Sequence, residues 1–161
     1  MTQLVFHHDI NQLINLPNSV IPVRLYGTGD KNLQIAHIGN TVLDQVKRLG
    51  IEPSDAVMDF LTIALAVTAA DTFVLRKDTA NGWCRSFSIT LPLCQPDIWQ
   101  VNKLHLERIL HFLSGDIWQF NFQADGQLPP QPYKLNGRTK LVDLINKDSV
   151  CLFSGGLDSA I

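Results

Sequence analysis

Alternation of apolar and polar residues predicts two half-buried strands in the second half of the chain. Every second residue from Phe87 to Leu93 is apolar, with serine, threonine and proline between them. A period of two places the apolar set on one face of a strand. Residues 118–123 repeat the pattern with three aromatic side chains. We expect these rings to lie in the core rather than to form a platform that stacks nucleotide bases.

Two apolar runs nearer the N-terminus, 20–26 and 33–38, predict two further strands. The segment between them, Gly27-Thr28-Gly29-Asp30-Lys31-Asn32, begins like a dinucleotide-binding fingerprint, but Asn32 stands where the third glycine belongs. Because the residues that follow predict a strand rather than a helix, we interpret this segment as a hairpin turn.

A long apolar segment, residues 56–75, predicts a buried helix. Pro53-Ser54-Asp55 supplies the start signal, since the Ser54 side chain can accept N–H bonds from the first turn and Asp55 complements the positive helix end. The segment is barely long enough to cross a bilayer, and Asp59 and Asp71 would each cost a few kcal/mol there. We therefore expect a core helix and no membrane span.

A second helix is predicted between Pro96-Asp97 and Ser114-Gly115-Asp116, which supply its start and stop signals. Its apolar residues recur at helical spacing, so we expect them on one buried face: Ile98, Val101 or Asn102, Leu106, Ile109 or Leu110, and Leu113.

These elements predict an α+β domain over residues 1–124, with an antiparallel or mixed sheet and two main helices. Residues 125–138 contain three prolines and two glycines and no periodicity, so residues 125–148 are interpreted as a connector. A second domain, of the doubly wound α/β class, is expected to begin at residues 149–161, and most of it would lie beyond Ile161.

Composition and charge narrow the classes of partner. The formal net charge of -2 argues against a protein that holds long nucleic acid by backbone electrostatics, so a small molecule or a protein is the expected partner. No signal peptide is evident near His7-His8 and Asp9, which indicates a cytoplasmic protein. Three cysteines without CxxC spacing predict neither a disulfide framework nor a zinc site.

The most specific chemical signal is Ser154-Gly155-Gly156-Leu157-Asp158-Ser159, directly after the apolar run 150–153. Adjacent glycines let successive backbone N–H groups turn into one concavity, and the serine hydroxyls add donors that can wrap an anion. A carboxylate among anion-binding groups is expected where Mg²⁺ bridges it to phosphate oxygens, so Asp158 is a candidate Mg²⁺ ligand. The lysine of a Walker loop is absent from this segment.

This hexapeptide after a hydrophobic strand resembles the PP-loop of the N-type ATP pyrophosphatase superfamily, and all specified positions of that motif are present. By this resemblance, Ser154, Gly155, Gly156, Asp158 and Ser159 hold the pyrophosphate of ATP. The wider pattern, from Trp83-Cys84-Arg85 through 112–118, resembles the QatC family of QueC-like proteins from the Qat anti-phage defence system. These are similar to 7-cyano-7-deazaguanine synthase in their PP-loop domain.

The resemblance implies an ATP-dependent ligase that forms AMP and pyrophosphate while activating a carboxylate on a 7-deazaguanine-type substrate. The activated carboxylate would then either be amidated towards a nitrile or be conjugated to an amine of a partner protein. ATP and Mg²⁺ are the implied cofactors. Zinc is implied only for a cysteine cluster that would lie beyond Ile161.

Other chemistries fit the chain less well. An N-terminal-nucleophile amidotransferase needs a cysteine after Met1, and Thr2 occupies that position. The other amidotransferase type needs a glycine-flanked cysteine, which Cys84 is not, and His105-Leu106-Glu107 is interpreted as ordinary helix sequence. The spacing of the five histidines predicts no metal site.

Two polar pairs are candidate packing features near the end of the first helix. Asp71 and Arg76 could form an ion pair, and Arg85 could stack on Trp83 as a cation–π pair. We favour a structural role for both pairs.

An alternative function of another class remains open. Residues 1–124 could form a non-catalytic interaction module that docks a partner protein of the defence system. A contiguous exposed apolar patch on this domain would favour that alternative.

Overall fold

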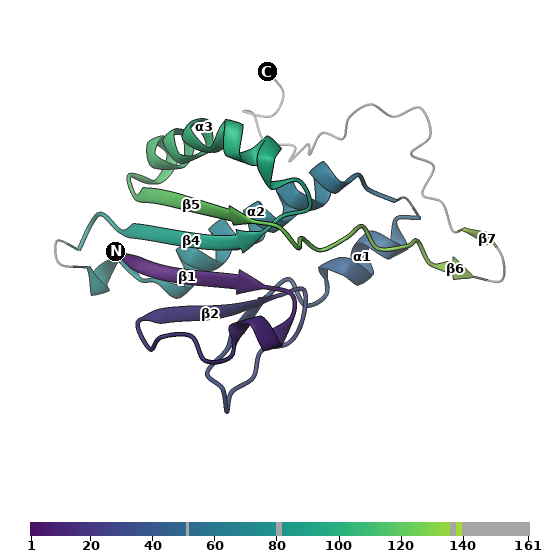
Figure 1. Cartoon of the computed structure of the whole chain (residues 1–161), viewed down its shortest axis with the longest axis horizontal. Helices are drawn as coiled ribbons and strands as arrows, with labels where there is room; N and C mark the ends of the chain where they lie inside the picture. Colours follow the sequence, from purple (N-terminus) through teal and green to yellow (C-terminus); the bar gives the residue numbers. More distant parts are fainter. Residues whose placement is uncertain (51, 80–81, 136–137, 140–161) are drawn as a thin grey trace, which may run out of the picture.

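The computed structural model describes residues 1–50, 52–79, 82–135 and 138–139. Its centre is a five-stranded sheet in which all neighbouring strands run parallel (Figure 1). From one edge to the other, the strands are β3 (Ala36–Ile38), β2 (Val20–Leu25), β1 (Thr2–His7), β4 (Ser86–Pro92) and β5 (Ile117–Gln123).

The predicted antiparallel or mixed sheet is therefore wrong, and the fold is α/β. Alternation along a strand reports that one face is buried and the other is not, but it does not report strand direction. Here one face carries the core residues, including Leu4, Val23, Ile89 and Phe120, all at most 2% exposed. The other face carries polar residues such as Ser88 at intermediate burial. A parallel sheet with such unequal faces imitates the pattern of an antiparallel one.

The predicted hairpin after β2 is also wrong. Strands β2 and β3 pair in parallel, with Val23 opposite Ala36 and Leu25 opposite Ile38. The chain must therefore run back to the edge of the sheet at which the strands begin before it forms β3, and residues 26–35 make this connection. Within this loop a single antiparallel bridge joins Asp30 to Ile35. Gly29 is needed for the close packing of this loop, because a Cβ at this position would lie 2.3 Å from the carbonyl oxygen of Ile35.

Helix α2 (Asp55–Phe73) confirms the predicted long helix, and Ser54 caps it by accepting a hydrogen bond from the backbone N–H of Val57. In the view of Figure 1, α2 runs behind the sheet. The short helix η1 (Ile10–Leu13) follows β1 and contacts both β1 and β2. Met58, Ile63 and Ala66 of α2 pack into the same core as the strands. By length and composition alone α2 could cross a membrane, but the core helix of a soluble protein passes the same test.

Helix α3 (Pro96–Ser114) has the predicted boundaries, and Gly115 ends it in the left-handed conformation, with a φ of 73°. Its packing differs from the prediction. Trp99, Leu106 and Leu110 lie against the core, whereas Ile98, Val101, Ile109 and Leu113 are exposed. The predicted face ran between these two sets, because apolar residues occur nearly all around this helix and spacing alone could not select the buried side.

The aromatic side chains of β5 lie in the core as predicted. Trp118 is 4% exposed and Phe120 is 2% exposed. The Trp118 ring contacts Phe87 of β4 at a centroid distance of 4.6 Å, which joins the two strands on their buried face.

The remaining elements lie before β4 and after β5. Helix α1 (Val42–Arg48) precedes α2, and η2 (Arg76–Asp78) follows it. After β5 the chain returns to α1, where the backbone N–H of Tyr133 donates to the carbonyl oxygen of Lys47 and its hydroxyl donates to Asp44. A short antiparallel pair, β6 (Lys134–Leu135) and β7 (Arg138–Thr139), comes last among the described elements.

Candidate functional site at the carboxyl edge of the sheet

The phosphate-binding residues predicted from the sequence lie outside the described residues. This applies to Ser154, Gly155, Gly156, Asp158 and Ser159, and equally to the predicted second domain. The site described below is therefore built from the N-terminal part of the chain.

The strand order places a switch point beside β1. From β1 the chain winds outward through β2 and β3, and after α2 it returns to the other side of β1 as β4 and then β5. In open parallel sheets, ligands bind outside the carboxyl ends of the strands at such a point, where the connections diverge. Residues that follow β1, β4 and β5 are thus the first place to look for a site.

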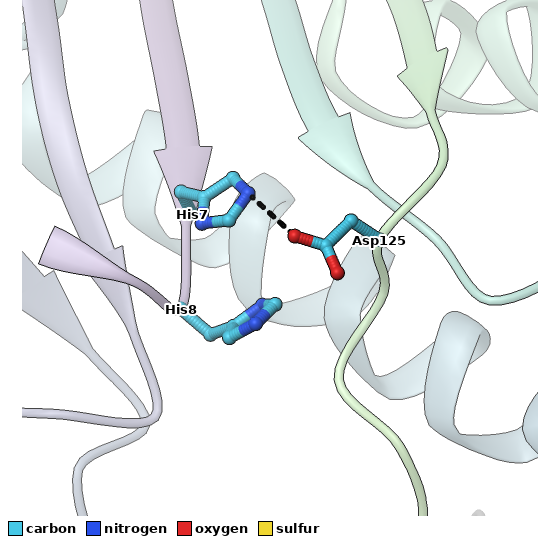
Figure 2. Close-up of side chains that lie close together, drawn as sticks. All are labelled: His7, His8 and Asp125. Carbon is cyan, nitrogen blue, oxygen red and sulfur yellow. Dashed lines mark ion pairs between the residues drawn. The ribbon is translucent and has the colours of Figure 1, made fainter. Parts of the chain in front are cut away.

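Two histidines and one aspartate meet at this edge (Figure 2). His7 ends β1, His8 follows it, and Asp125 lies two residues beyond the end of β5. The Nε2 atom of His7 lies 3.5 Å from a carboxylate oxygen of Asp125. The rings of His7 and His8 stack with centroids 4.7 Å apart. One ligand atom from each of the three residues lies within 4.8 Å of the others.

The backbone around Asp125 is closely packed, although the Asp125 side chain itself is 74% exposed. Asp125 itself has a φ of 76°, a left-handed conformation that aspartate tolerates better than most residues. Gly126 passes so close to the end of β4 that an added Cβ would lie 2.1 Å from the backbone nitrogen of Cys94. The backbone N–H of Leu93 donates to the carbonyl oxygen of Gln123 at 2.8 Å, which extends the β4–β5 pairing to this point.

The hydrogen bonds of His7 assign its proton. Its Nδ1 accepts a hydrogen bond of 3.0 Å from the backbone N–H of Asp9, so the proton of the neutral ring lies on Nε2, which faces Asp125. Burial lowers the pKa of His7 below its ordinary value, and the His8 ring lowers it too, against the raising effect of Asp125 and Asp9. The ring is thus neutral at pH 7.

This assignment decides between two kinds of chemistry. Two imidazoles and a carboxylate are typical ligands of zinc or non-haem iron, and the buried Nδ1 of His8 has no hydrogen-bond partner among the described residues. However, a metal at Nε2 of His7 would have to displace the proton there while Nδ1 stays occupied by the Asp9 N–H. The arrangement therefore fits a His7–Asp125 pair that joins β1 to the segment after β5 better than a metal centre.

Histidine spacing alone did not predict this cluster. The carboxylate comes from a position more than a hundred residues away in the sequence, and only the parallel order of β1, β4 and β5 brings it to His7. The signal that could have found it is the position of both groups directly after an apolar strand, combined with the strand order.

A second polar group lies on the helix side of the same edge. Asp59 of α2 is 1% exposed and accepts hydrogen bonds from the backbone N–H of Cys94 at 2.6 Å and of Gln95 at 2.9 Å. The indole N–H of Trp99 donates to the same carboxylate at 3.1 Å. Asp59 thus accepts hydrogen bonds from the backbone N–H groups just ahead of α3, which have no partner within the helix. These bonds explain how a carboxylate is accommodated in the apolar helix α2.

Burial and Asp59 together raise the pKa of Cys94 to about 11, so its thiol is protonated at neutral pH and is a poor nucleophile. Burial also raises the pKa of Tyr26 to about 12, and its hydroxyl hydrogen bonds to Thr62 at 2.7 Å. Neither group offers acid–base or nucleophilic chemistry near pH 7.

The residues of the alternative amidotransferase dyad have other roles. Glu107 accepts a hydrogen bond of 2.9 Å from the backbone N–H of Phe120, an outward-facing donor on edge strand β5. His105 is exposed on α3. The side chain of Glu107 therefore satisfies the edge of the sheet, which agrees with its interpretation as an ordinary helix residue.

The polar pairs predicted near the end of α2 exchange partners in the structure. Arg76 binds Asp116 rather than Asp71, at 3.0 Å, and Asp71 binds Arg85 at 2.5 Å. Arg85 also binds Asp116 at 2.7 Å and lies over the ring of Phe87 rather than Trp83, with its guanidinium carbon 5.2 Å from the ring centroid. A structural role was expected for both pairs, but the partners were wrong because Asp116 was assigned only to a helix stop signal.

The burial of His7 predicts a pH dependence of stability. Because folding lowers the pKa of His7, the unfolded chain binds a proton more readily, and stability falls as the pH drops below about 6.5, the ordinary value for histidine. We expect thermal unfolding between pH 8 and 5 to show this loss and His7→Gln to flatten it. His37→Gln, at an exposed position of β3, is the control and should keep the parent slope. If the stability of His7→Gln depended on pH as steeply as that of the parent protein, the lowered pKa of His7 would be contradicted.

No protein-family model, curated protein or solved structure compared with this chain matches it.

Proposed function

We propose that this chain is the N-terminal part of a PP-loop ligase that uses ATP and Mg²⁺ and releases AMP and pyrophosphate. The observation that carries the proposal is the complete hexapeptide Ser154-Gly155-Gly156-Leu157-Asp158-Ser159 after an apolar run. Adjacent glycines and flanking hydroxyls suit a pyrophosphate, and a carboxylate in their midst suits the magnesium ion that accompanies it.

The proposed substrate is a carboxylate of the 7-deazaguanine type, activated by adenylation in a bacterial anti-phage defence system. This part of the proposal rests on the resemblance to QueC-like proteins described above. The acceptor of the activated carboxylate is either ammonia or an amine of a partner protein. A cytoplasmic location, where ATP is abundant, is proposed with it.

The described domain supports a role in positioning rather than in chemistry. Two ionisable groups at the carboxyl edge of its sheet are not free for chemistry near pH 7, since His7 faces Asp125 and the Cys94 thiol is protonated. We propose that the PP-loop segment supplies the chemistry and that residues 1–124 hold a partner.

Protein docking is the second candidate function of this domain, and one observation favours it. The outer side of α3 exposes a run of large apolar side chains, with Val101 at 81% and Phe112 at 87% exposure. A contiguous surface of this kind marks interaction sites in soluble proteins.

The ligase proposal is tested by pyrophosphate release from ATP and Mg²⁺ with 7-carboxy-7-deazaguanine, using the protein expressed from its complete reading frame. We expect substrate-dependent release that Asp158→Ala lowers roughly 100-fold or more, because loss of the metal ligand removes several kcal/mol of charge stabilisation. Asp148→Ala, ten residues earlier and outside the motif, is the matched control. Absence of release in the parent protein, or equal release from Asp158→Ala, would refute the proposal.

A further inference from the structure

The chain that follows β5 crosses the carboxyl edge of the sheet and then docks on α1. We call residues 124–133 the strap. Figure 1 shows it in light green, passing the end of β4 on its way from β5 towards α1. At one end Gly126 lies against the end of β4, since an added Cβ would lie 2.1 Å from the backbone nitrogen of Cys94. At the other end the backbone N–H of Tyr133 donates to Lys47 of α1 at 3.1 Å. The strap is therefore anchored at both ends.

The strap lies over the switch point between β1 and β4, where open parallel sheets bind their ligands. Asp125 faces His7 at the end of β1, with 3.5 Å between the carboxylate oxygen and Nε2 (Figure 2). The next two residues lie against the chain that leaves β4. Gly126 contacts its backbone, and the carbonyl oxygen of Gln127 accepts a hydrogen bond of 3.4 Å from the thiol of Cys94. A segment of this chain thus occupies the place that a ligand takes in such folds.

The strap is held by few contacts. None of its residues belongs to the hydrophobic core, and within it only Pro130 is buried. The Asp125 side chain is 74% exposed and Leu128 is 67% exposed. At the far end, the bond of 3.0 Å from the Tyr133 hydroxyl to Asp44 is exposed as well. Segments with few buried apolar contacts open locally at a lower free energy than the whole fold unfolds. The strap is therefore the part of the carboxyl edge that opens most readily.

Three prolines between the two anchors stiffen the strap. They are Pro129, Pro130 and Pro132. Each proline ring fixes its own φ, and proline-rich segments behave as semi-rigid spacers rather than flexible coils. Movement at one anchor is therefore transmitted to the other.

We propose that the strap is a gate over the switch point, which closes the carboxyl edge between β1 and β4 and opens as one unit while the sheet stays folded. A ligand reaches the end of β1 only when the strap is open. The inference is independent of the proposed ATP chemistry, because no residue of the strap belongs to the phosphate-binding motif.

Alkylation of Cys94 in the folded protein measures the opening, because its half-buried thiol is bonded to the strap. The intact chain is treated with iodoacetamide at pH 8, and peptide mass spectrometry separates Cys94 from the other two cysteines. Gly126→Ala must lift the strap, since its Cβ would meet backbone atoms of Leu93 and Cys94. We expect Cys94 to react about tenfold faster or more in this variant. Circular dichroism establishes that each variant is folded.

Tyr133→Ala tests whether the strap opens as one unit. It removes the hydroxyl bond to Asp44 and the ring that lies 5.5 Å from the Lys47 ammonium, at the end of the strap remote from Cys94. We expect Cys94 to react about threefold faster or more. Leu128→Ala is the matched control, because this exposed side chain lies between the anchors, and it should keep the parent rate.

Two results would overturn the inference. One is a parent rate of Cys94 alkylation in both Gly126→Ala and Tyr133→Ala. The other is a faster reaction in Gly126→Ala alone, because opening would then be confined to one end of the strap. If Gly126→Ala does not fold, the rate in Tyr133→Ala decides by itself. Asp158→Ala should react at the parent rate, so the gate and the ligase proposals fail separately.

Discussion

Asp116→Ala is expected to lower the free energy of unfolding by about 3–5 kcal/mol, the range seen when one partner of a buried ion pair is removed. The Asp116 side chain is fully buried and joins two cations. It accepts hydrogen bonds from the Arg85 guanidinium at 2.7 and 3.1 Å and from the Arg85 backbone N–H at 2.8 Å. Arg76 adds two more at 3.0 Å. Alanine would leave the 3% exposed Arg85 without its main counterion.

Three structural elements depend on this carboxylate. Arg85 directly precedes β4, Arg76 lies in η2, and Asp116 directly precedes β5. Arg85 also donates to the carbonyl oxygens of Asp71 and Val74, which belong to the C-terminal end of α2. Loss of Asp116 therefore loosens the amino edge of the sheet and the end of its main core helix together.

Urea unfolding followed by circular dichroism measures this effect. Asp71→Asn is the matched control, since its side chain is 66% exposed and its bond to Arg85 should contribute about 1 kcal/mol or less. Burial raises the pKa of Asp116, but the hydrogen bonds and charge of Arg85 and the charge of Arg76 outweigh it, so the pKa is lowered. The stabilisation is therefore present above about pH 4 and is lost as the pH falls through the folded pKa. An Asp116→Ala cost near that of Asp71→Asn would contradict the role assigned here.

The location of the main elements could be predicted from the sequence, but not their pairing. The start of α2 at Ser54, the end of α3 at Gly115 and the aromatic face of β5 follow from local signals, namely a cap, a stop residue and a period of two. Strand direction depends on the length and path of the connections. The loop 26–35 carries the chain back along the sheet, so that β3 pairs in parallel with β2. Its glycines predicted a hairpin turn instead, because they are equally compatible with either connection.

The candidate site was beyond reach of local signals for the same reason. His7 and Asp125 become neighbours only because β1, β4 and β5 are parallel and adjacent, so that their carboxyl ends coincide. The buried side of α3 escaped prediction because Trp99, which directs that helix onto the core, lay outside the face that spacing selected. Val101, which the spacing placed on the predicted buried face, is 81% exposed instead.

Asp59→Ala is expected to lower the free energy of unfolding by about 2–4 kcal/mol. One hydrogen bond to a charged acceptor contributes roughly 1.5–3 kcal/mol, and the three donors, which are only partly buried, regain part of their loss from water. The carboxylate lies on α2, and its donors lie at the end of β4 and the start of α3, so a single buried side chain ties the two helices to the sheet. Asp59→Asn should recover only part of the loss, because its amide N–H₂ group faces a donor.

Trp99→Phe separates the contributions within this group. It removes one of the three donors and keeps an aromatic ring beside Phe60, so we expect a cost of about 1 kcal/mol. Urea unfolding by circular dichroism is the measurement, and alkylation of Cys94 gives an independent readout. Since Asp59 contributes to the raised pKa of Cys94, its removal should make the thiol react faster at pH 8. Equal costs for Asp59→Ala and Trp99→Phe would mean that the indole bond alone matters. The backbone donors before α3 would then be satisfied without Asp59.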